Sequence, residues 1–197
     1  ATVGHGLTLA APEMMILKNR ESNGGWHIYH TTLGATKNVR FTTASAVTQS
    51  GVFNNTEPTA SVVTLGTNSA INASGQDIIA YCFHSVDGYS KVGSYTGNGS
   101  ATDGTFVHCG FKPAWVMVKV TNVTDSWFIN DNKRDSYNVV DEQLKANSSD
   151  AEATNRGLDF VSNGFKIRDS STSHNASGNT YIFLAFAESP FKHSNAR

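Results

Sequence analysis

Three segments of this chain recur in the same order about a hundred residues further on, and this repetition constrains the fold more than any other feature. The matching segments are residues 12–18 with 113–119, residues 26–30 with 127–131, and Asn72-Ala-Ser-Gly75 with Asn175-Ala-Ser-Gly178. The offset is 101 for the first two pairs and 103 for the third. Repeated order with so little drift predicts an internal duplication. Residues that recur at equivalent places are expected to serve the fold, and unrepeated residues become the candidates for function.

The composition favours a chain of short strands. Ser, Thr, Asn and Gly are abundant and the residues that favour helices are scarce, which is typical of an all-β fold with many turns. The 197 residues suffice for one large β domain or two small ones. We expect a first repeat over residues 1–90 and a second over residues 91–197, packed as one compact unit or as two tandem sandwiches. Because the chain starts at Ala1 without an initiator Met, we expect it to be a piece of a longer polypeptide or a processed product.

Charge and hydropathy exclude two classes of partner. Charged residues are 16% of the chain and the net charge is −1, so no basic surface is expected to recruit nucleic acid. No apolar run approaches the roughly 18–20 residues that span a bilayer, so we expect no membrane insertion.

Alternating apolar residues and turn formers predict the strands. Residues 14–18 and 115–119 each follow a proline, as at the start of a strand, and each leads through a turn into a second strand that begins at Trp26 or Trp127. Two further hairpins are expected, residues 62–65 with 78–83 and residues 164–168 with 180–186. Many short strands with regular turns predict an antiparallel β-sandwich or jelly roll.

Two local features are left with alternatives. Residues 139–146 have helical character, but asparagines bracket them and residues 38–43 at the matching place read as a strand. At most one short helical turn is therefore expected there. Cys82 is expected to be a small core residue, and a disulfide between Cys82 and Cys109 stays open.

The sequence offers little metal or catalytic chemistry. His27 and His30 lie three apart in an expected strand, so their side chains should point to opposite faces and no zinc site is expected. A Ca²⁺ site is an open alternative among oxygen ligands near one loop, namely Asp125, Asn130, Asp131, Asn132, Asp135 and Asp141. No Gly-x-Ser-x-Gly motif occurs and no motif pairs two carboxylates for glycoside cleavage. We therefore expect no catalytic residues, and no enzyme.

Aromatic and polar residues that have no equivalent in the other repeat are the candidate ligand contacts. Trp26 and Trp127 recur, so both are expected to face the core rather than to stack on sugars. The candidates that remain are Tyr29, His30, Asn130, Asp131, Arg134, Asp135 and Tyr137. Most of them lie in the unrepeated stretch 130–137, which is where function is expected.

The second half also resembles a known family. Residues 110–119, Trp127, residues 134–140, residues 162–168 and residues 175–191 together resemble the repeated β-rich modules of marine bacteriophage virion proteins. The first half is less similar, because it lacks an element like Arg134-Asp-Ser-Tyr-Asn138. The resemblance implies a tail-fibre-like virion component and brings no catalytic motif.

These observations lead to one expected function and two alternatives. We expect a non-catalytic module on the virion surface, hence extracellular, that binds a receptor on the host cell, a glycan in the first instance or a protein. Its other partners would be virion subunits, with a homotrimer as one arrangement. The alternatives are a purely structural or decoration subunit and a glycan depolymerase domain.

Overall fold

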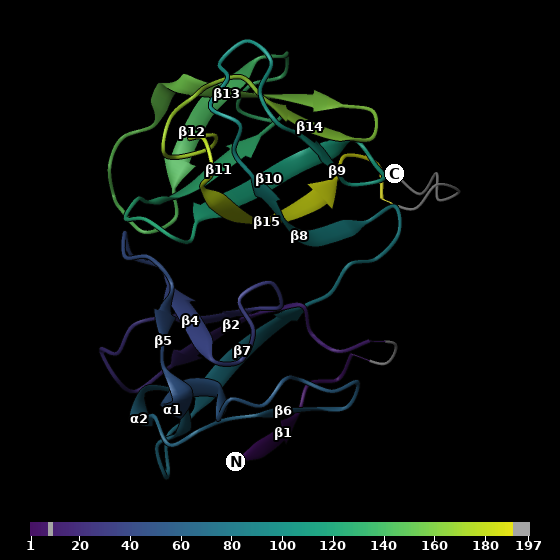
Figure 1. Cartoon of the computed structure of the whole chain (residues 1–197). Coiled ribbons are helices and arrows are strands. Elements are labelled where there is room, and N and C mark those ends of the chain that lie inside the picture. The colour runs from purple at the N-terminus through teal and green to yellow at the C-terminus, as the bar shows by residue number, and fades with distance from the viewer. Residues whose placement is uncertain (8–9, 191–197) are drawn as a thin grey trace. The chain divides into compact units, whose positions relative to one another are not determined.

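Antiparallel strands make up almost all regular structure in the computed structural model of the chain (Figure 1). The structure describes residues 1–7 and 10–190, so the end of the expected second repeat, residues 191–197, lies outside the described residues. The expected all-β antiparallel fold class is confirmed. The chain divides into two compact units, Ala1–His84 and Ser85–Arg197. The expected boundary after residue 90 falls inside the second unit, because Ser90 already pairs with Phe186 in its sheet.

The first unit combines two sheets and two helical turns around one core. A five-stranded sheet has the order β5-β4-β3-β2-β7, and β1 pairs with β6 in a two-stranded sheet. The strands are β1 (Thr2–Gly4), β2 (Met14–Asn19), β3 (His27–His30), β4 (Lys37–Arg40), β5 (Val47–Thr48), β6 (Val62–Thr64) and β7 (Ile78–Phe83), with α1 (Ser50–Phe53) and α2 (Ser69–Asn72) between them. Met15, Leu17, Phe53 and Ile71 are among its buried core residues.

The second unit is one eight-stranded, nearly closed and barrel-like sheet (Figure 1). Its order is β8-β15-β10-β11-β12-β13-β14-β9, so the consecutive strands β8 and β9 are its two ends. The strands are β8 (Ser90–Thr96), β9 (Phe106–His108), β10 (Pro113–Val120), β11 (Trp127–Asp131), β12 (Val140–Lys145), β13 (Ala153–Val161), β14 (Gly164–Ile167) and β15 (Thr180–Ala187). Side chains from seven of these strands form one apolar core, to which Val118, Phe165 and Phe183 belong.

The central strands of the two units pair with their neighbours in the same register. The matching pairs are Ile16 with Ile28 and Met117 with Ile129 on one side, and Leu17 with Ala80 and Val118 with Phe183 on the other. The repeated sequence segments therefore adopt the same strand pairings. That the halves arose by duplication remains an inference.

A lysine side chain holds the first hairpin of each unit. Nζ of Lys18 donates to the carbonyls of Ser22 and Gly24, at 2.8 and 2.7 Å, and Nζ of Lys119 donates to the carbonyl of Asp125 at 2.7 Å. Lys119 is 0% exposed. Burial lowers the pKa of Lys119 to about 8, against the attraction of Asp125. Buried donors of this kind need acceptors, so the turn carbonyls and the lysine depend on one another.

The two further hairpins that the sequence suggested are wrong. Residues 62–65 do not pair with residues 78–83, because β6 pairs with β1 and β7 pairs with β2. Likewise β14 pairs with β13 and β9, whereas β15 pairs with β10 and β8. Each last strand returns instead to the central strand of its unit, β7 to β2 and β15 to β10.

Residues 139–146, for which at most one short helical turn was expected, contain none and contribute strand β12. Val140 and Gln143 are buried and the strand pairs with β11 and β13. Tertiary pairing here outweighs the local helical preference. No helix among the described residues is long and apolar enough to cross a membrane.

The repeated tryptophans have different environments. Trp127 begins β11 and is 1% exposed, as expected. Trp26 is 36% exposed and lies against Phe41 with a 6.0 Å centroid distance, so its assignment to the core is wrong. The reason is that β3 begins one residue later, at His27. Cys82 and Cys109 are both free, so the disulfide alternative is not realised.

The pH dependence of stability should report the burial of Lys119. Its pKa of about 8 in the folded protein lies below the ordinary 10.5, so the unfolded chain holds more protons between these values. The free energy of unfolding should therefore rise with pH across this window. Between pH 8 and pH 10.5, the free energy of unfolding of the wild type should rise by up to about 3 kcal/mol relative to that of Lys119→Met. Urea denaturation at several pH values measures this difference. Lys37→Met, at an exposed lysine, is the control. A flat difference between wild type and Lys119→Met would contradict the assignment.

Candidate functional site

The loop between β11 and β12 carries the unrepeated residues, and Asp131 sets its first turn. Oδ1 of Asp131 accepts the backbone N–H groups of Lys133 and Arg134, both at 3.0 Å. An aspartate that accepts the N–H groups two and three residues on favours a tight turn without help from glycine. The loop therefore leaves β11 in a defined direction.

Arg134 then fastens this loop to the sheet. Its Nε donates to Asp131 and its Nη1 donates to Glu152, both at 2.7 Å, while Nη2 donates to the carbonyl of Ile129 at 3.2 Å. Burial alone would raise the pKa of Asp131, but hydrogen bonds from Arg134 and Lys133 leave that pKa lowered. The guanidinium is thus engaged in holding the loop, which is a positioning role rather than a grip on a ligand.

Tyr137 is presented to solvent by anchored neighbours. On one side, the carboxylate of Asp135 accepts the N–H of Asp141 at 3.0 Å. On the other, the side chain of Asn138 donates to the carbonyl of Phe160 at 3.1 Å and accepts its N–H at 2.9 Å. Tyr137 itself is 84% exposed. A ring held out on a fixed backbone costs less entropy to bind than one on a mobile loop.

A hollow of about 140 Å³ lies beside this ring. It is lined by Lys112, Asn132, Ser136, Tyr137, Asn138, Val140 and Phe160. Nζ of Lys112 lies 2.9 Å from the carboxylate of Glu188, and Nδ2 of Asn132 donates to the same carboxylate at 2.7 Å. Oδ1 of Asn132 is buried and accepts no hydrogen bond from the described residues. The hollow therefore combines apolar surface with the ammonium group of Lys112 and several polar side chains.

Asn130 is a predicted site residue that the structure places in the core. It is 1% exposed, and its Nδ2 donates to the carbonyls of Val140 at 3.2 Å and Glu142 at 3.4 Å. These bonds connect β11 to β12. Asn130 therefore supports the loop from beneath and does not reach its surface.

Tyr29 and His30 belong to the first unit and are buried there, at 2% and 0% exposure. The hydroxyl of Tyr29 donates to Glu57 at 2.5 Å, and Glu57 also accepts the N–H of Ala35 at 2.7 Å. Burial and the bond to Glu57 raise the pKa of Tyr29. Nδ1 of His30 accepts the N–H of Thr32 at 3.2 Å. Both residues stabilise the interior of their unit, and the structure does not bring them to a surface.

The metal alternatives gain no support from the geometry. His27 pairs with Asn38 at 3.2 Å, and burial together with the charge of Arg40 lowers its pKa to about 4. Among residues 1–7 and 10–190, no three His, Cys, Asp or Glu side chains are grouped closely enough to hold a metal ion. The carboxylate of Asp125 accepts hydrogen bonds from Ser126 and Ser173. The Ca²⁺ alternative stays an untested prediction.

Asp169 and the buried His174 form a pair that was not predicted from the sequence. Nδ1 of His174 lies 3.3 Å from Asp169, and the imidazole is 0% exposed with Phe128 against it at 5.2 Å between ring centroids. Burial raises the pKa of Asp169, but hydrogen bonds from His174 and Ser171 leave it lowered. Nε2 of His174 has no hydroxyl partner in the described chain. The imidazole therefore lacks a bonded nucleophile, and it is closed off from solvent.

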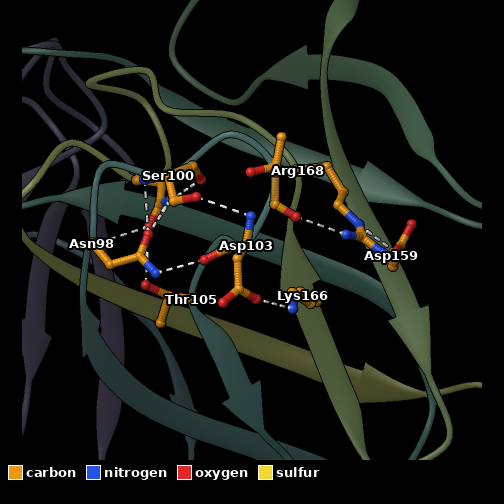
Figure 2. Close-up of polar contacts among 9 residues, drawn as sticks. Asn98, Ser100, Asp103, Thr105, Asp159, Lys166 and Arg168 are labelled. Atoms are coloured by element: carbon orange, nitrogen blue, oxygen red, sulfur yellow. Dashed lines mark hydrogen bonds and ion pairs between the residues drawn. The ribbon is translucent and has the colours of Figure 1, made fainter.

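A polar network holds the loop between β8 and β9 (Figure 2). Oδ1 of Asn175 accepts the N–H of Asn98 and the hydroxyl of Thr105, both at 3.0 Å. Nδ2 of Asn175 donates to the carbonyl of Ser100 at 2.8 Å. Asn175 belongs to the repeated turn and is 0% exposed. It therefore connects the two end strands of the sheet through their loop.

Two ion pairs complete this network (Figure 2). Nζ of Lys166 donates to Asp103 at 2.6 Å, and this hydrogen bond lowers the pKa of Asp103. Arg168 pairs with Asp159 and also donates to the carbonyl of Thr102 at 3.2 Å. The charged groups are satisfied within the network itself. Its role is to hold the nearly closed sheet together, so the hollow beside Tyr137 is the better candidate site.

Two residues of the hollow, Lys112 and Asn132, and Glu188, which contacts both, were not among the predicted ligand contacts, because the three come from distant parts of the sequence. Lys112 precedes β10 and Glu188 follows β15, and adjacent pairing of these strands brings them together. Asn132 was considered only as a cation ligand. Without the strand order, no local pattern connects the three.

Removal of Arg134 should loosen the loop. Arg134→Met breaks contacts with Asp131 and Glu152 in a partly shielded position, so we expect a loss of about 1–2 kcal/mol in the free energy of unfolding. Arg20→Met is the matched control, because Arg20 and Asp77 form an exposed pair at 3.7 Å. That variant should lose less than about 0.5 kcal/mol. Equal losses in urea denaturation would show that Arg134 is no anchor.

Comparison with known proteins gives one match. No curated protein and no solved structure matches the chain. A family model described as "Domain of unknown function (DUF7483)" matches residues 1–190. Because this match spans almost the entire sequence, the chain belongs to the DUF7483 family.

Proposed function

We propose that the second unit is a non-catalytic binding module that takes a cell-surface glycan at the hollow beside Tyr137. The observation that carries the proposal is the combination of a tyrosine 84% exposed, a backbone anchored on both sides of it, and an adjacent polar hollow. An aromatic side chain with one apolar face and one polar end suits an interface that is partly apolar and partly wet.

The chemistry of the hollow suits a sugar ring. The face of Tyr137 offers an apolar surface to the C–H groups of a pyranose. Lys112 offers a donor at the hollow, and the side chains of Asn132, Ser136 and Asn138 add polar groups for sugar hydroxyls. The volume of about 140 Å³ is well below the roughly 300–1,000 Å³ of sites for drug-sized ligands. One saccharide unit of a longer chain is therefore the ligand of matching size.

The biological setting that we propose rests on the sequence resemblance. A tail-fibre-like component on a virion surface would meet host glycans, and it would assemble with other virion subunits, in a homotrimer for example. A second candidate function, a structural subunit that packs against neighbours, is favoured by the open sheet edge at β7. The two functions use different units of the chain and are compatible.

A glycan array with host-type polysaccharides tests the binding role. We expect saturable binding by the wild type and at least a tenfold weaker affinity for Tyr137→Ala, equivalent to about 1.4 kcal/mol or more. Asn132→Ala should weaken binding of the same glycans. Tyr81→Ala is the matched control, because Tyr81 is also an exposed tyrosine, at 46%, but lies in the first unit.

The outcomes separate the candidates. Binding that is lost in Tyr137→Ala and retained in Tyr81→Ala supports the proposal. No binding to any glycan, or binding that Tyr137→Ala leaves intact, overturns it in favour of the structural role. Release of reducing ends from a bound polysaccharide would contradict the non-catalytic assignment.

A further inference from the structure

The outer edge of β7 in the first unit has no partner strand. β7 is the last strand of its sheet and pairs only with β2 among the described residues. Arg20 donates to the carbonyl of Asp77, so by alternation the N–H groups of Ile78, Ala80 and Cys82 point away from β2. The segment Ile-Ile-Ala-Tyr-Cys-Phe contains no charge and no proline, which are the residues that usually protect an edge.

The equivalent edge in the second unit is covered. β15 corresponds to β7 by sequence offset and by register, and β8 pairs with it along seven residues. The effect on burial is large: Leu184 is 2% exposed, whereas Tyr81 at the matching position is 46% exposed. Phe183 is 3% exposed, and Ala80 at its matching position is exposed.

β8 also supplies part of the core of the second unit. Tyr95 stacks on Tyr181 with 4.9 Å between ring centroids and makes an edge contact with Phe165 at 6.1 Å. It also lies 6.4 Å from Phe183, and its hydroxyl donates to the carbonyl of His174 at 2.8 Å. Tyr95 therefore closes the barrel-like core at the end of the sheet.

The first unit has a cavity at the corresponding place. Its volume is about 240 Å³. Most of its lining is apolar, and Asn72, Gln76 and Asp77 add polar groups; the apolar lining residues are Val3, Leu17, Val63, Leu65, Ile71, Ala73, Ile78 and Ala80. Ile78 and Ala80 occupy the positions of Tyr181 and Phe183. Val63 faces Val3 as Phe165 faces Val107, so it occupies the position of Phe165. The residues that surround Tyr95 in the second unit thus have counterparts around an empty space in the first.

We propose that the first unit accepts an extended segment of a partner protein as an additional strand antiparallel to β7, with a large aromatic or aliphatic side chain in this cavity. The partner segment resembles β8 in one respect: it places a large apolar or aromatic side chain opposite Ile78, as β8 places Tyr95 opposite Tyr181. Strand addition at an edge supplies main-chain hydrogen bonds for affinity and a pocket for specificity. This inference is independent of the glycan site.

One position distinguishes the partner segment from β8. A Cβ on Gly93 would lie 2.8 Å from the ring of Phe183, so β8 requires glycine there. In the first unit the opposing residue is Ala80, which leaves room for a side chain. A β8 peptide with Gly93→Val therefore fits β7 but cannot replace β8 in the second unit.

The experiment titrates a labelled peptide of residues 89–97 carrying Gly93→Val onto the intact protein. We expect saturable binding, with slower amide hydrogen exchange at Ile78, Ala80 and Cys82. A second peptide, in which Tyr95→Ser removes the ring that enters the cavity, should bind at least tenfold more weakly. Ala80→Pro removes one outward N–H and should abolish binding, whereas Ala80→Ser keeps that N–H and should bind as the wild type does.

Each result decides the proposal. Binding with protection of β7 that Ala80→Pro abolishes supports it. Absence of binding by either peptide, binding without protection of β7, or equal binding of the Tyr95→Ser peptide overturns it. A concentration-dependent dimer of the protein alone, lost in Ala80→Pro, would identify a second copy as the occupant and overturn the partner-segment assignment. Loss of binding in Ala80→Pro counts only if the circular dichroism of that variant is native-like. If the variant does not fold, protection of β7 by the peptide in the wild type still tests the proposal.

Discussion

The pairing of one central strand on both sides fixes the geometry of each unit, and β10 shows why. Its residues Val116 to Val120 are all buried, and the core cluster takes Val116, Val118 and Val120 from one face of it. A slip of one residue would move these three side chains to the other face. The register with β11 and β15 is therefore strongly specified. Lys119, on the opposite face, then meets the turn carbonyl of Asp125 at a fixed distance.

The position of the candidate glycan site depends on this register. Because β11 is fixed against β10, Asp131 starts the loop at a defined point, and Arg134 and Asn138 fasten its two ends to neighbouring strands. Most polar groups of the loop are used for its own conformation. The ring of Tyr137 takes no part in this anchoring and is left for a ligand. Some residues of the loop thus fix its conformation while others are free to contact a ligand, and this preorganises a loop that has no regular secondary structure.

The sequence was informative where a pattern is local or repeated, and misleading where pairing is distant. Alternation and the constant offset located the hairpins around Lys18 and Lys119, because a tight turn connects strands that are adjacent in the sequence. The partner of β6 was mistaken because its true neighbour, β1, lies far away along the chain. β14 has one distant neighbour, β9, and forms a local hairpin with β13 that the sequence patterns did not reveal. The repeat also led to the wrong assignment of Trp26 to the core. Trp127 is the first residue of β11, whereas β3 begins after Trp26, at His27, so Trp26 lies outside the strand ladder. Among the candidate contacts, Tyr137 lies at the surface, whereas Tyr29, His30 and Asn130 are buried, and no local pattern reveals burial of polar residues.

The comparison of the units also says what kind of segment suits β7. Ordering a free peptide costs roughly 1–2 kcal/mol per residue, whereas burying one aromatic side chain returns about 1.5–3 kcal/mol. The ring alone therefore cannot hold a flexible strand, and main-chain hydrogen bonds must contribute along the whole edge. β8 avoids most of this cost because it is tethered to the sheet that it completes, through the loop held by Asn175. A natural partner of β7 should be preordered in the same sense, as an edge or arm of a folded neighbour. Strand addition would thus be a means of assembly, while the loop at Tyr137 stays open to a ligand.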